Sequence, residues 1–369
     1  MTKKQTIHIA ILGTRGIPAN YGGFETFAEE LSVHLAQRGH DVTVYGRAQY
    51  IRTKEKFYRG VRLVVLPNIM HQYLDTPFNT SLATLHAIFK KYDILLYCNS
   101  ANSFCTIFPR ILGTPVVLNV DGLEWKRAKW NKFGKAVYKV SEFMSTFLPH
   151  QIVTDAREVQ SYYKKKFNKA SYCIPYGAPI NTTRTTKVLN EFGVQKNKYI
   201  LYVSRLEPEN NAHVVIQAFE KVKTKLKLVI VGDSPFSREY VESLKKTKDS
   251  RIVFTGYVFG QGYREFQAHA YCYIQATEAG GTQPALVEAM GANNCILAND
   301  VPQHREVLGN AGEYFSAKDP NTLTQKLQEL VASPKQIQTL KEKALQRVQE
   351  KYSWNKVTTD YEKLFRKMI

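Results

Sequence analysis

Short apolar segments alternate with longer amphipathic segments along most of the chain. Residues 7–12, 94–98 and 115–120 are nearly continuous apolar runs, which indicates strands buried on both faces. Residues 23–38 and 79–90 repeat apolar positions every three or four residues, as amphipathic helices do. This alternation predicts a parallel sheet with helices on both faces.

The alternation begins again with the apolar run 199–203, which suggests a second domain. Residues 174–198 contain two prolines and a polar stretch, so they are the best candidate for a linker. We therefore expect an α/β protein of two doubly wound, Rossmann-like domains. Ligands bind in such folds beyond the carboxyl ends of parallel strands, so we expect a site in a cleft between the domains. The expected parts are an N-terminal domain at 1–180, a C-terminal domain at 181–350, and a last helix at 351–369 that packs back toward the N-terminal domain.

Composition excludes several classes of protein. The 369 residues are 44% hydrophobic and 22% charged, which is typical of a globular chain rather than a disordered one. No stretch approaches the roughly 18–20 apolar residues of a membrane span, and the run 7–12 is too short for a secretory signal. We expect a cytoplasmic protein whose five scattered cysteines are reduced and hold no zinc.

The formal net charge of +19 favours an acidic partner: nucleic acid, anionic lipid or a phosphorylated ligand. Between residues 126 and 169 there are eleven Lys or Arg against three Asp or Glu, with aromatic residues between them. This pattern fits either a solvated helix face or a patch that lies on an anionic membrane. We predict that the segment 125–169 docks on anionic lipid at the inner face of the cell membrane.

Three loops that follow predicted strands carry candidate chemistry. The first is a glycine-rich loop after the strand 7–12, with Gly13, Gly16, Gly22 and Gly23. Glycines allow a close approach of the backbone to a ligand, and the helix that follows presents free N–H groups to a phosphate. The spacing fits neither the dinucleotide fingerprint nor a P-loop.

The second loop carries Arg205, directly after the apolar strand 199–203. An arginine at the carboxyl end of a buried strand can bind a diphosphate through two parallel hydrogen bonds. The alternative is an ordinary surface ion pair with Glu207 or Glu209.

The third loop follows residues 272–275 and opens another helix. Thr282 or Gln283 can cap this helix and Pro284 suits its first turn, so its N–H groups are expected to point toward an anion. Glu288 lies one turn further on, among apolar neighbours, and could accept hydrogen bonds from ribose hydroxyls. A glutamate in such surroundings needs a partner.

Together these stretches resemble the retaining glycosyltransferases of the GT-B fold, family four, and more narrowly a bacterial branch with rhamnosyltransferases of capsule and cell-wall assembly. The resemblance runs from residue 11 to residue 354. Its most specific pieces are YGGFET at 21–26, NVDGLEW at 119–125, RLEPENN at 205–211 and GGTQP at 280–284.

The resemblance implies roles for individual residues. Glycines 22 and 23 would border the donor diphosphate, Arg205 would neutralise it, and Asp121 stands where the wider family often has a histidine close to the reacting sugar. Tyr257 and Val258 would flank the base and Glu288 would bind the ribose. We expect Asp121 and Arg205 to be catalytic. The expected donor-binding residues are Gly22, Gly23, Arg205, Asn210, Tyr257, Val258, Gly281, Thr282, Gln283, Pro284, Ala285 and Glu288. The expected acceptor-side residues are Arg15, Glu124 and Trp125.

Two positions depart from the family pattern. A lysine usually follows the arginine by five residues, where this chain has Asn210, and a second glutamate usually stands at the position of Gly280. Without this lysine, less positive charge is available to bind the donor diphosphate, and Arg15 could compensate for the loss. The lost carboxylate is compatible with a deoxy sugar such as rhamnose.

The resemblance implies a retaining transfer of a sugar, with L-rhamnose from dTDP-rhamnose as the first choice, to a lipid-linked saccharide in polysaccharide biosynthesis. We expect front-face attack by the acceptor hydroxyl, no cofactor and no required metal, because cations and backbone N–H groups stabilise the leaving diphosphate. Three alternatives remain: another nucleotide-sugar enzyme of this fold, such as an epimerase or phosphorylase; a nucleic-acid-binding protein, suggested by charge alone; and a weakly active sugar-binding subunit.

Overall fold

The computed structural model describes residues 5–19, 22–51, 53–69, 75–126, 130–180, 183–235, 237–278 and 282–369. The chain divides into two compact units. The first consists of Met1–Tyr176 together with Trp354–Ile369, and the second of Gly177–Ser353.

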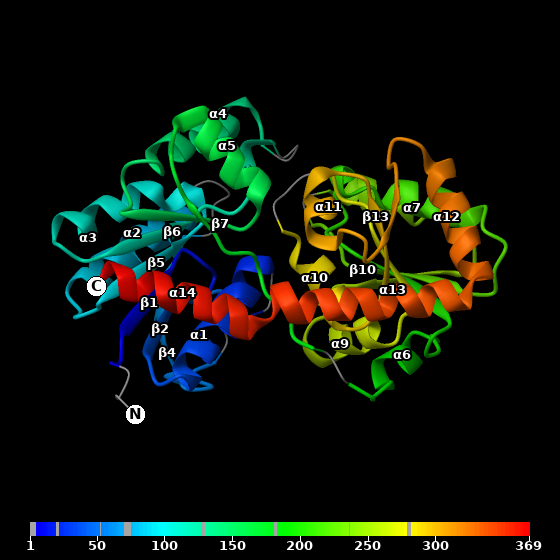
Figure 1. The fold of residues 1–369 in the computed structure, drawn as a ribbon, viewed down its shortest axis with the longest axis horizontal. Helices are drawn as coiled ribbons and strands as arrows, with labels where there is room; N and C mark the ends of the chain where they lie inside the picture. The colour runs from blue at the N-terminus through cyan, green and yellow to red at the C-terminus, as the bar shows by residue number, and fades with distance from the viewer. Residues whose placement is uncertain are drawn as a thin grey trace. The chain divides into compact units, whose positions relative to one another are not determined.

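The first unit contains an eight-stranded sheet in the order β3-β4-β2-β1-β5-β6-β7-β8, parallel except for β3 (Figure 1). Its strands are β1 (His8–Leu12), β2 (Asp41–Arg47), β3 (Phe57–Tyr58), β4 (Val61–Leu66), β5 (Ile94–Cys98), β6 (Val116–Asn119), β7 (Gln151–Thr154) and β8 (Tyr172–Cys173). Its helices are α1 (Gly23–Gln37), α2 (Asp75–Ile88), η1 (Ser100–Thr106), α3 (Ile107–Ile111), η2 (Glu124–Lys126), α4 (Lys132–Met144), α5 (Arg157–Phe167) and α14 (Trp354–Met368).

Alternate residues of each strand enter different cores, because successive side chains point to opposite faces of a sheet. Ile9 and Ile11 of β1 pack with α1 and α14 on one face. Ala10 and Leu12 pack with α2, η1 and α5 on the other. Both faces are therefore covered, and only the strand ends remain for ligands.

The second unit contains a six-stranded parallel sheet in the order β11-β10-β9-β12-β13-β14. Its strands are β9 (Tyr199–Val203), β10 (Lys227–Val231), β11 (Ile252–Gly256), β12 (Cys272–Gln275), β13 (Cys295–Asn299) and β14 (Glu313–Phe315). Its helices are α6 (Lys187–Glu191), η3 (Pro208–Asn210), α7 (Ala212–Glu220), α8 (Arg238–Leu244), α9 (Gly260–Ala268), α10 (Pro284–Gly291), α11 (Pro302–Leu308), α12 (Pro320–Ala332), α13 (Pro334–Arg347) and the π-helical turn η4 (Val348–Tyr352).

The same division of side chains shapes the second unit. Ile200 and Tyr202 of β9 face the layer that includes α7 and α12. Tyr199 and Leu201 face the layer that includes α9 and α10. The expected α/β class with two Rossmann-like domains is therefore confirmed.

Several element boundaries differ from the sequence-based expectations. Helix α5 was not expected, because its sequence is strongly polar on average, although Val159 and Tyr163 are buried. The expected linker contains the short helix α6. The units change at Tyr176–Gly177 and at Ser353–Trp354, whereas the expected domains change after residues 180 and 350.

Candidate functional site

In the second unit, four neighbouring strands bring the candidate donor residues to one edge of the sheet. Strands β11, β10, β9 and β12 are parallel, so the segments that follow them start at the same edge. Arg205 follows β9, Tyr257 follows β11, and Glu288 lies on α10 after β12. The loops after β9 and β12 are joined directly, because the Asn211 side-chain amide donates to the Ala276 carbonyl oxygen (2.9 Å).

Arg205 is half-buried at the carboxyl end of β9. Within the part of the chain that the structure describes, its guanidinium forms no ion pair, so the surface-pair alternative with Glu207 or Glu209 finds no support there. Its own backbone carbonyl oxygen accepts a hydrogen bond from the buried Asn210 side-chain amide (2.7 Å). Asn210, at the position of the family's lysine, therefore shapes the turn that carries Arg205.

Glu288 has the partner that its apolar neighbours require. The Tyr263 hydroxyl donates to Glu288 Oε2 (2.5 Å) and accepts from the Gln267 side-chain amide (2.8 Å). Burial, with the Glu288 charge second, raises the pKa of Tyr263 well above its usual value. Tyr263 therefore remains a donor and orients the carboxylate.

Two aromatic rings follow β11. Tyr257 and Phe259 are both exposed, and their rings stack with centroids 5.7 Å apart and an interplanar angle of 14°. Val258, between them, packs instead against the buried layer that includes α9 and α10. A stacked, exposed aromatic pair at a sheet edge offers a flat apolar surface to a base.

Helix α10 begins at Pro284 with Gln283 as N-cap, as expected. Thr282 is buried, and Gln283, Pro284 and Ala285 are partly exposed. Pro284 has no N–H, so donors at this helix end come from the residues around it. The predicted donor residue Gly281 and the departure at Gly280 lie outside the described residues.

In the first unit, Asp121 follows β6 at the carboxyl edge of the sheet. Its backbone is left-handed, with φ 58°, a conformation that aspartate adopts more readily than most residues. The buried Tyr176 hydroxyl donates to Asp121 Oδ1 (2.8 Å), and the Asp121 N–H donates to Asn119 Oδ1 (3.0 Å). The carboxylate is thus held in one orientation at the edge.

Two buried glutamates of α1 fix the glycine-rich loop after β1. Glu25 Oε1 accepts from the Arg15 backbone N–H (3.0 Å), and Glu29 Oε2 accepts from the Ala19 N–H (2.6 Å). The Glu25 carboxylate also lies close to Gly22, at the first turn of α1. A negative charge there already balances the helix dipole, which makes this end better suited to sugar hydroxyls than to a diphosphate.

Of the acceptor-side candidates, Trp125 is anchored to α4, whereas Glu124 and Arg15 contact aromatic residues outside it. The Trp125 indole N–H donates to the buried Glu142 carboxylate (2.8 Å), and the Trp130 indole N–H lies 3.4 Å from Glu124 Oε2. Glu142 also accepts from Tyr162 (2.7 Å) and Lys166 (2.9 Å). The Arg15 guanidinium stacks over the Tyr50 ring, with 4.6 Å to its centroid.

The structure places the predicted residues in two groups. Arg205, Asn210, Tyr257, Val258, Thr282, Gln283, Pro284, Ala285 and Glu288 belong to the second unit; Arg15, Gly22, Gly23, Asp121, Glu124 and Trp125 belong to the first. The sequence did not predict a role for Tyr263, Phe259, Tyr176 or Glu142. The need of Glu288 for a partner was the one available signal, and it did not say which side chain would supply it.

Among the described residues, no group of three or more His, Cys, Asp or Glu side chains is arranged to hold a metal ion. None of the described helices combines the length and the apolar character needed to cross a membrane.

Comparison with protein families gives two matches. Residues 197–333 match the family described as glycosyl transferases group 1. Residues 5–179 match a domain of unknown function, DUF1972. The first match lies within the second unit, which holds Arg205 and Glu288.

Curated relatives are bacterial glycosyltransferases. A Campylobacter jejuni N-acetylgalactosaminyltransferase that acts on a diphospho-undecaprenol saccharide is 26% identical over 40% of this chain and 41% of its own. A Salmonella typhimurium lipopolysaccharide 1,2-N-acetylglucosaminetransferase is 24% identical over 58% of this chain and 61% of its own. The chain therefore spans less than two thirds of the length of these relatives.

Solved structures share the fold over nearly the whole chain. Anabaena HepE in complex with UDP superposes with a TM-score of 0.78 at 16% identity, covering 98% of this chain and 100% of its own. A sucrose-phosphate synthase from Thermosynechococcus elongatus has a TM-score of 0.83 at 16% identity, covering 97% and 98%. The chain thus carries a glycosyltransferase group 1 domain at residues 197–333 within the two-domain GT-B fold.

Proposed function

We propose that this chain is a retaining glycosyltransferase that moves a sugar from a nucleoside diphosphate to a lipid-linked saccharide during bacterial polysaccharide assembly, at the inner face of the membrane. The observation that carries the proposal is the sheet edge of the second unit. There Arg205 lacks an ion-pair partner among the described residues. Neighbouring strands of the same sheet carry Glu288, whose carboxylate can accept hydrogen bonds from ribose, and the stacked rings of Tyr257 and Phe259.

These groups match the three parts of a nucleoside diphosphate. A guanidinium pairs with phosphate oxygens, a fixed carboxylate accepts hydrogen bonds from vicinal ribose hydroxyls, and stacked rings cover a base. When the sugar leaves, negative charge grows on the terminal phosphate, and Arg205 with the start of α10 would stabilise it. This route requires neither a cofactor nor a metal, and it uses no enzyme-bound sugar.

We propose that Asp121 contacts the transferred sugar, as the family resemblance implies. Asp121, oriented by Tyr176, and the loop shaped by Glu25 offer oxygen acceptors for sugar hydroxyls. Rhamnose from dTDP-rhamnose remains our first choice of donor. A uridine donor is the second candidate, because HepE was crystallised with UDP and UDP-glucose.

A calorimetric panel of nucleoside diphosphates and their sugars tests the donor site. We expect the protein to prefer one base. Arg205→Ala should weaken the binding of the corresponding nucleoside diphosphate at least tenfold, because charge-assisted hydrogen bonds contribute about 1.5–3 kcal/mol. Glu288→Ala should weaken the binding of the nucleoside as well as that of the nucleoside diphosphate. Lys343→Ala removes an exposed charge from α13 of the same unit and is the matched control.

The reaction can be tested without an acceptor by measuring the slow hydrolysis of the preferred sugar nucleotide. The measured quantity is the nucleoside diphosphate that is released. Turnover that depends on Arg205 and Asp121 would support a transferase. Tight binding of the donor without any turnover, even with lipid extracts that contain saccharide carriers, would favour the sugar-binding subunit instead.

A further inference from the structure

Exposed apolar side chains are concentrated on three neighbouring helices of the first unit. Of the eighteen large apolar side chains that are exposed among the described residues, eleven belong to α2, α3, α4 and the turns that follow them. Solvent-exposed apolar residues are normal when scattered, whereas a contiguous group marks a contact surface.

Helix α4 has its polar face inward and its apolar face outward. Its buried residues are Gly134, Ser141 and Glu142, and the Ser141 carbonyl oxygen accepts a hydrogen bond from Ser103 (2.9 Å). The inner face is therefore satisfied by polar contacts. The exposed apolar side chains of α4 and its following turn are Phe133, Val137, Val140, Phe143 and Phe147.

Helix α3 continues this surface. Arg110 donates to the Phe147, Leu148 and Pro149 carbonyl oxygens, which fixes α3 against the end of α4. Ile111 is 75% exposed. Helix α2 packs beside α3, and Phe89, directly after α2, is 79% exposed. The remaining exposed large apolar side chains of these two helices and the turns that follow them are Phe78, Leu85, Phe108 and Leu112.

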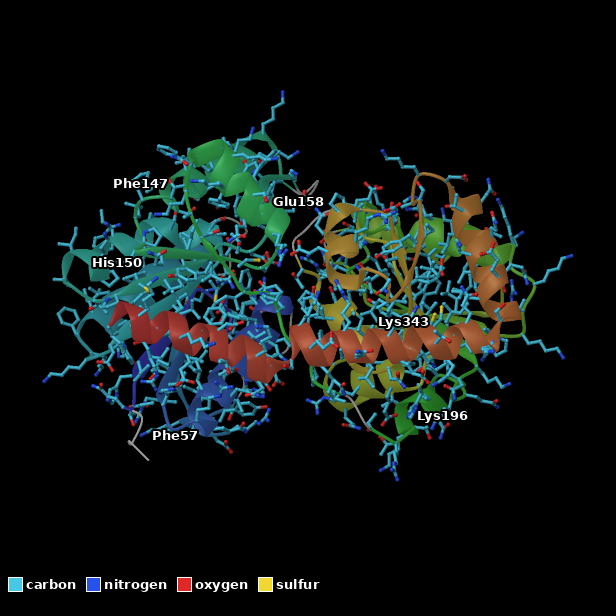
Figure 2. The ribbon with its side chains drawn as sticks, in the orientation of Figure 1. Phe57, Phe147, His150, Glu158, Lys196 and Lys343 are labelled. Carbon is cyan, nitrogen blue, oxygen red and sulfur yellow. The ribbon has the colours of Figure 1, made fainter. Side chains whose placement is uncertain are left out.

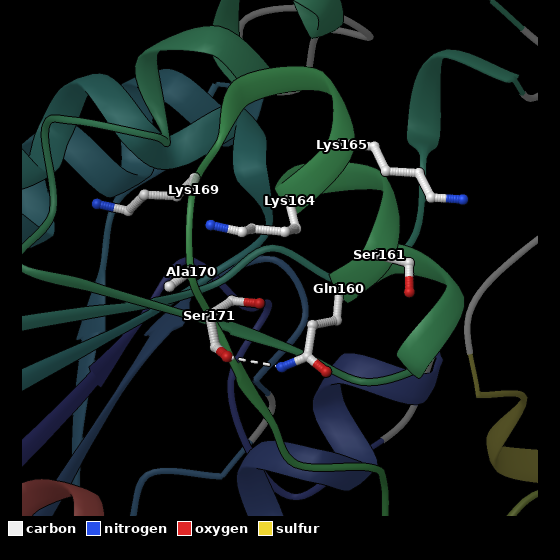
Figure 3. A pocket seen from close by; sticks show the side chains of 7 residues that line it. All are labelled: Gln160, Ser161, Lys164, Lys165, Lys169, Ala170 and Ser171. Carbon is white, nitrogen blue, oxygen red and sulfur yellow. Dashed lines mark hydrogen bonds between the residues drawn. The ribbon is translucent and has the colours of Figure 1, made fainter.

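A basic depression lies on α5, the helix that packs against α4. Figure 3 shows it on α5 and the loop that follows, where Lys164 and Lys169 point to the same side. Lys165, Gln160 and Ser171 also line it, and its volume is about 350 Å³. Helix α5 contacts α4 through Phe167, whose ring centroid lies 6.2 Å from that of Phe143. The helix that carries the depression is therefore in contact with α4.

Between residues 126 and 169, lysine and arginine outnumber aspartate and glutamate by eleven to three. Burial, and secondarily the nearby Arg110, lower the pKa of Lys169. A basic rim against an apolar face complements an anionic bilayer, whose headgroups carry the opposite charge above an apolar interior. A second copy of this chain would instead bring two basic rims together.

We propose that the outward faces of α2, α3 and α4 form a docking surface for an anionic phospholipid bilayer, with lipid phosphates received by the basic depression on α5. This extends the membrane location proposed above. It also revises the predicted contact segment: Trp125 faces the buried Glu142, while α2 and α3, outside the segment 125–169, join the surface.

Sedimentation with vesicles tests the apolar contribution. We expect wild-type protein to bind phosphatidylcholine vesicles that contain phosphatidylglycerol and not those of phosphatidylcholine alone. The triple variant Ile111→Ser, Phe143→Ser, Phe147→Ser should bind at least tenfold more weakly, because each apolar side chain loses its transfer free energy. Phe57→Ser, which removes an exposed aromatic from β3 at another edge of the unit (Figure 2), should bind as wild type does.

A matched pair of charge variants tests the depression. Lys164→Glu with Lys165→Glu should weaken binding to anionic vesicles severalfold more than Lys196→Glu with Lys343→Glu, which changes the net charge equally on the second unit (Figure 2). Equal effects of the two pairs would overturn the assignment of the headgroup site. An unchanged melting temperature confirms that the variants fold.

Two results would overturn the docking surface itself. One is unaltered vesicle binding by the triple variant. The other is a wild-type dimer in solution that the triple variant converts to a monomer, which would assign the face to a second copy. The assay contains neither nucleotide nor acceptor, so its failure would leave the proposed transfer reaction standing, and a failed nucleotide panel would leave the vesicle result standing.

Discussion

At the scale of single residues, the candidate carboxylates are oriented by tyrosine hydroxyls. Tyr263 donates to Glu288 and Tyr176 donates to Asp121. Burial is the main reason that the pKa of both tyrosines lies well above the usual value, and the accepting carboxylates add to it. Each hydroxyl therefore keeps its proton and restricts its carboxylate to one rotamer, which prepares the group for hydrogen bonds from a ligand.

Removal of the Tyr263 hydroxyl isolates this orienting effect. In Tyr263→Phe, Glu288 loses its donor and the Gln267 side-chain amide loses an acceptor, while the aromatic packing is kept. We expect the preferred nucleoside diphosphate to bind about two- to tenfold more weakly, since one hydrogen bond contributes roughly 0.5–1.5 kcal/mol. Calorimetry measures this loss.

A second tyrosine provides the control. Tyr314→Phe removes a hydroxyl that donates to the Gly309 carbonyl oxygen (2.6 Å) in the same unit, at the β14 edge. It should leave nucleotide affinity unchanged. Equal affinities of wild type and Tyr263→Phe would show that Glu288 does not depend on Tyr263.

At the scale of elements, helix α11 carries a buried histidine that couples folding to pH. The His304 ring nitrogen Nδ1 bonds to the Asn299 carbonyl oxygen (2.8 Å), which closes the turn between β13 and α11. Burial lowers the pKa of His304 from 6.5 to about 4. The folded protein therefore keeps this ring neutral at pH values where the unfolded chain protonates it.

The consequence is a loss of stability in mild acid. Above pH 6.5 both states are neutral and His304 contributes no pH dependence; between pH 6.5 and about 4 only the unfolded state gains the proton. The free energy of unfolding should fall over this window by about 3 kcal/mol on account of this residue. Urea unfolding at a series of pH values measures it, and His304→Gln should reduce the slope. An identical slope in the variant would contradict the assignment.

At the scale of the whole molecule, the chain leaves the first unit at Tyr176 and returns to it at Trp354. Helix α14 then packs against α1 and completes the first core with Trp354, Val357 and Tyr361. Its Glu362 pairs with Arg38 (3.1 Å). The first unit is therefore assembled from both ends of the sequence.

Deletion of residues 354–369 should unfold the first unit and spare the second. The deletion removes five fully or nearly fully buried large side chains, each contributing about 1.5–3 kcal/mol, against a domain stability of about 5–15 kcal/mol. Scanning calorimetry should then show one remaining transition that still responds to nucleotide. Deletion of residues 368–369 alone is the control, and two intact transitions after the larger deletion would contradict the prediction.

The local pattern of the sequence was sufficient for the fold class and for the strands that carry the candidate residues. Apolar runs such as 199–203 are strands because both faces of a parallel sheet are buried, and the residues after them must lie at the sheet edge. This reasoning placed Arg205 and Asp121 at the ends of β9 and β6, where the structure has them. The resemblance of the motifs then supplied their proposed roles.

The sequence could not specify contacts between residues that are distant along the chain. Tyr263 lies 25 residues from Glu288 and Tyr176 lies 55 from Asp121, and no periodicity connects such pairs. The outward apolar face of α4 is also undecided by its own sequence, because an amphipathic helix ordinarily buries its apolar side. Only tertiary packing, which satisfies Glu142 and Ser141 inside, determines which face is left to the solvent. The sequence by itself thus determined the class and the strand ends, whose burial is a local property, while the tertiary structure decided the side-chain pairs and the exposed surface.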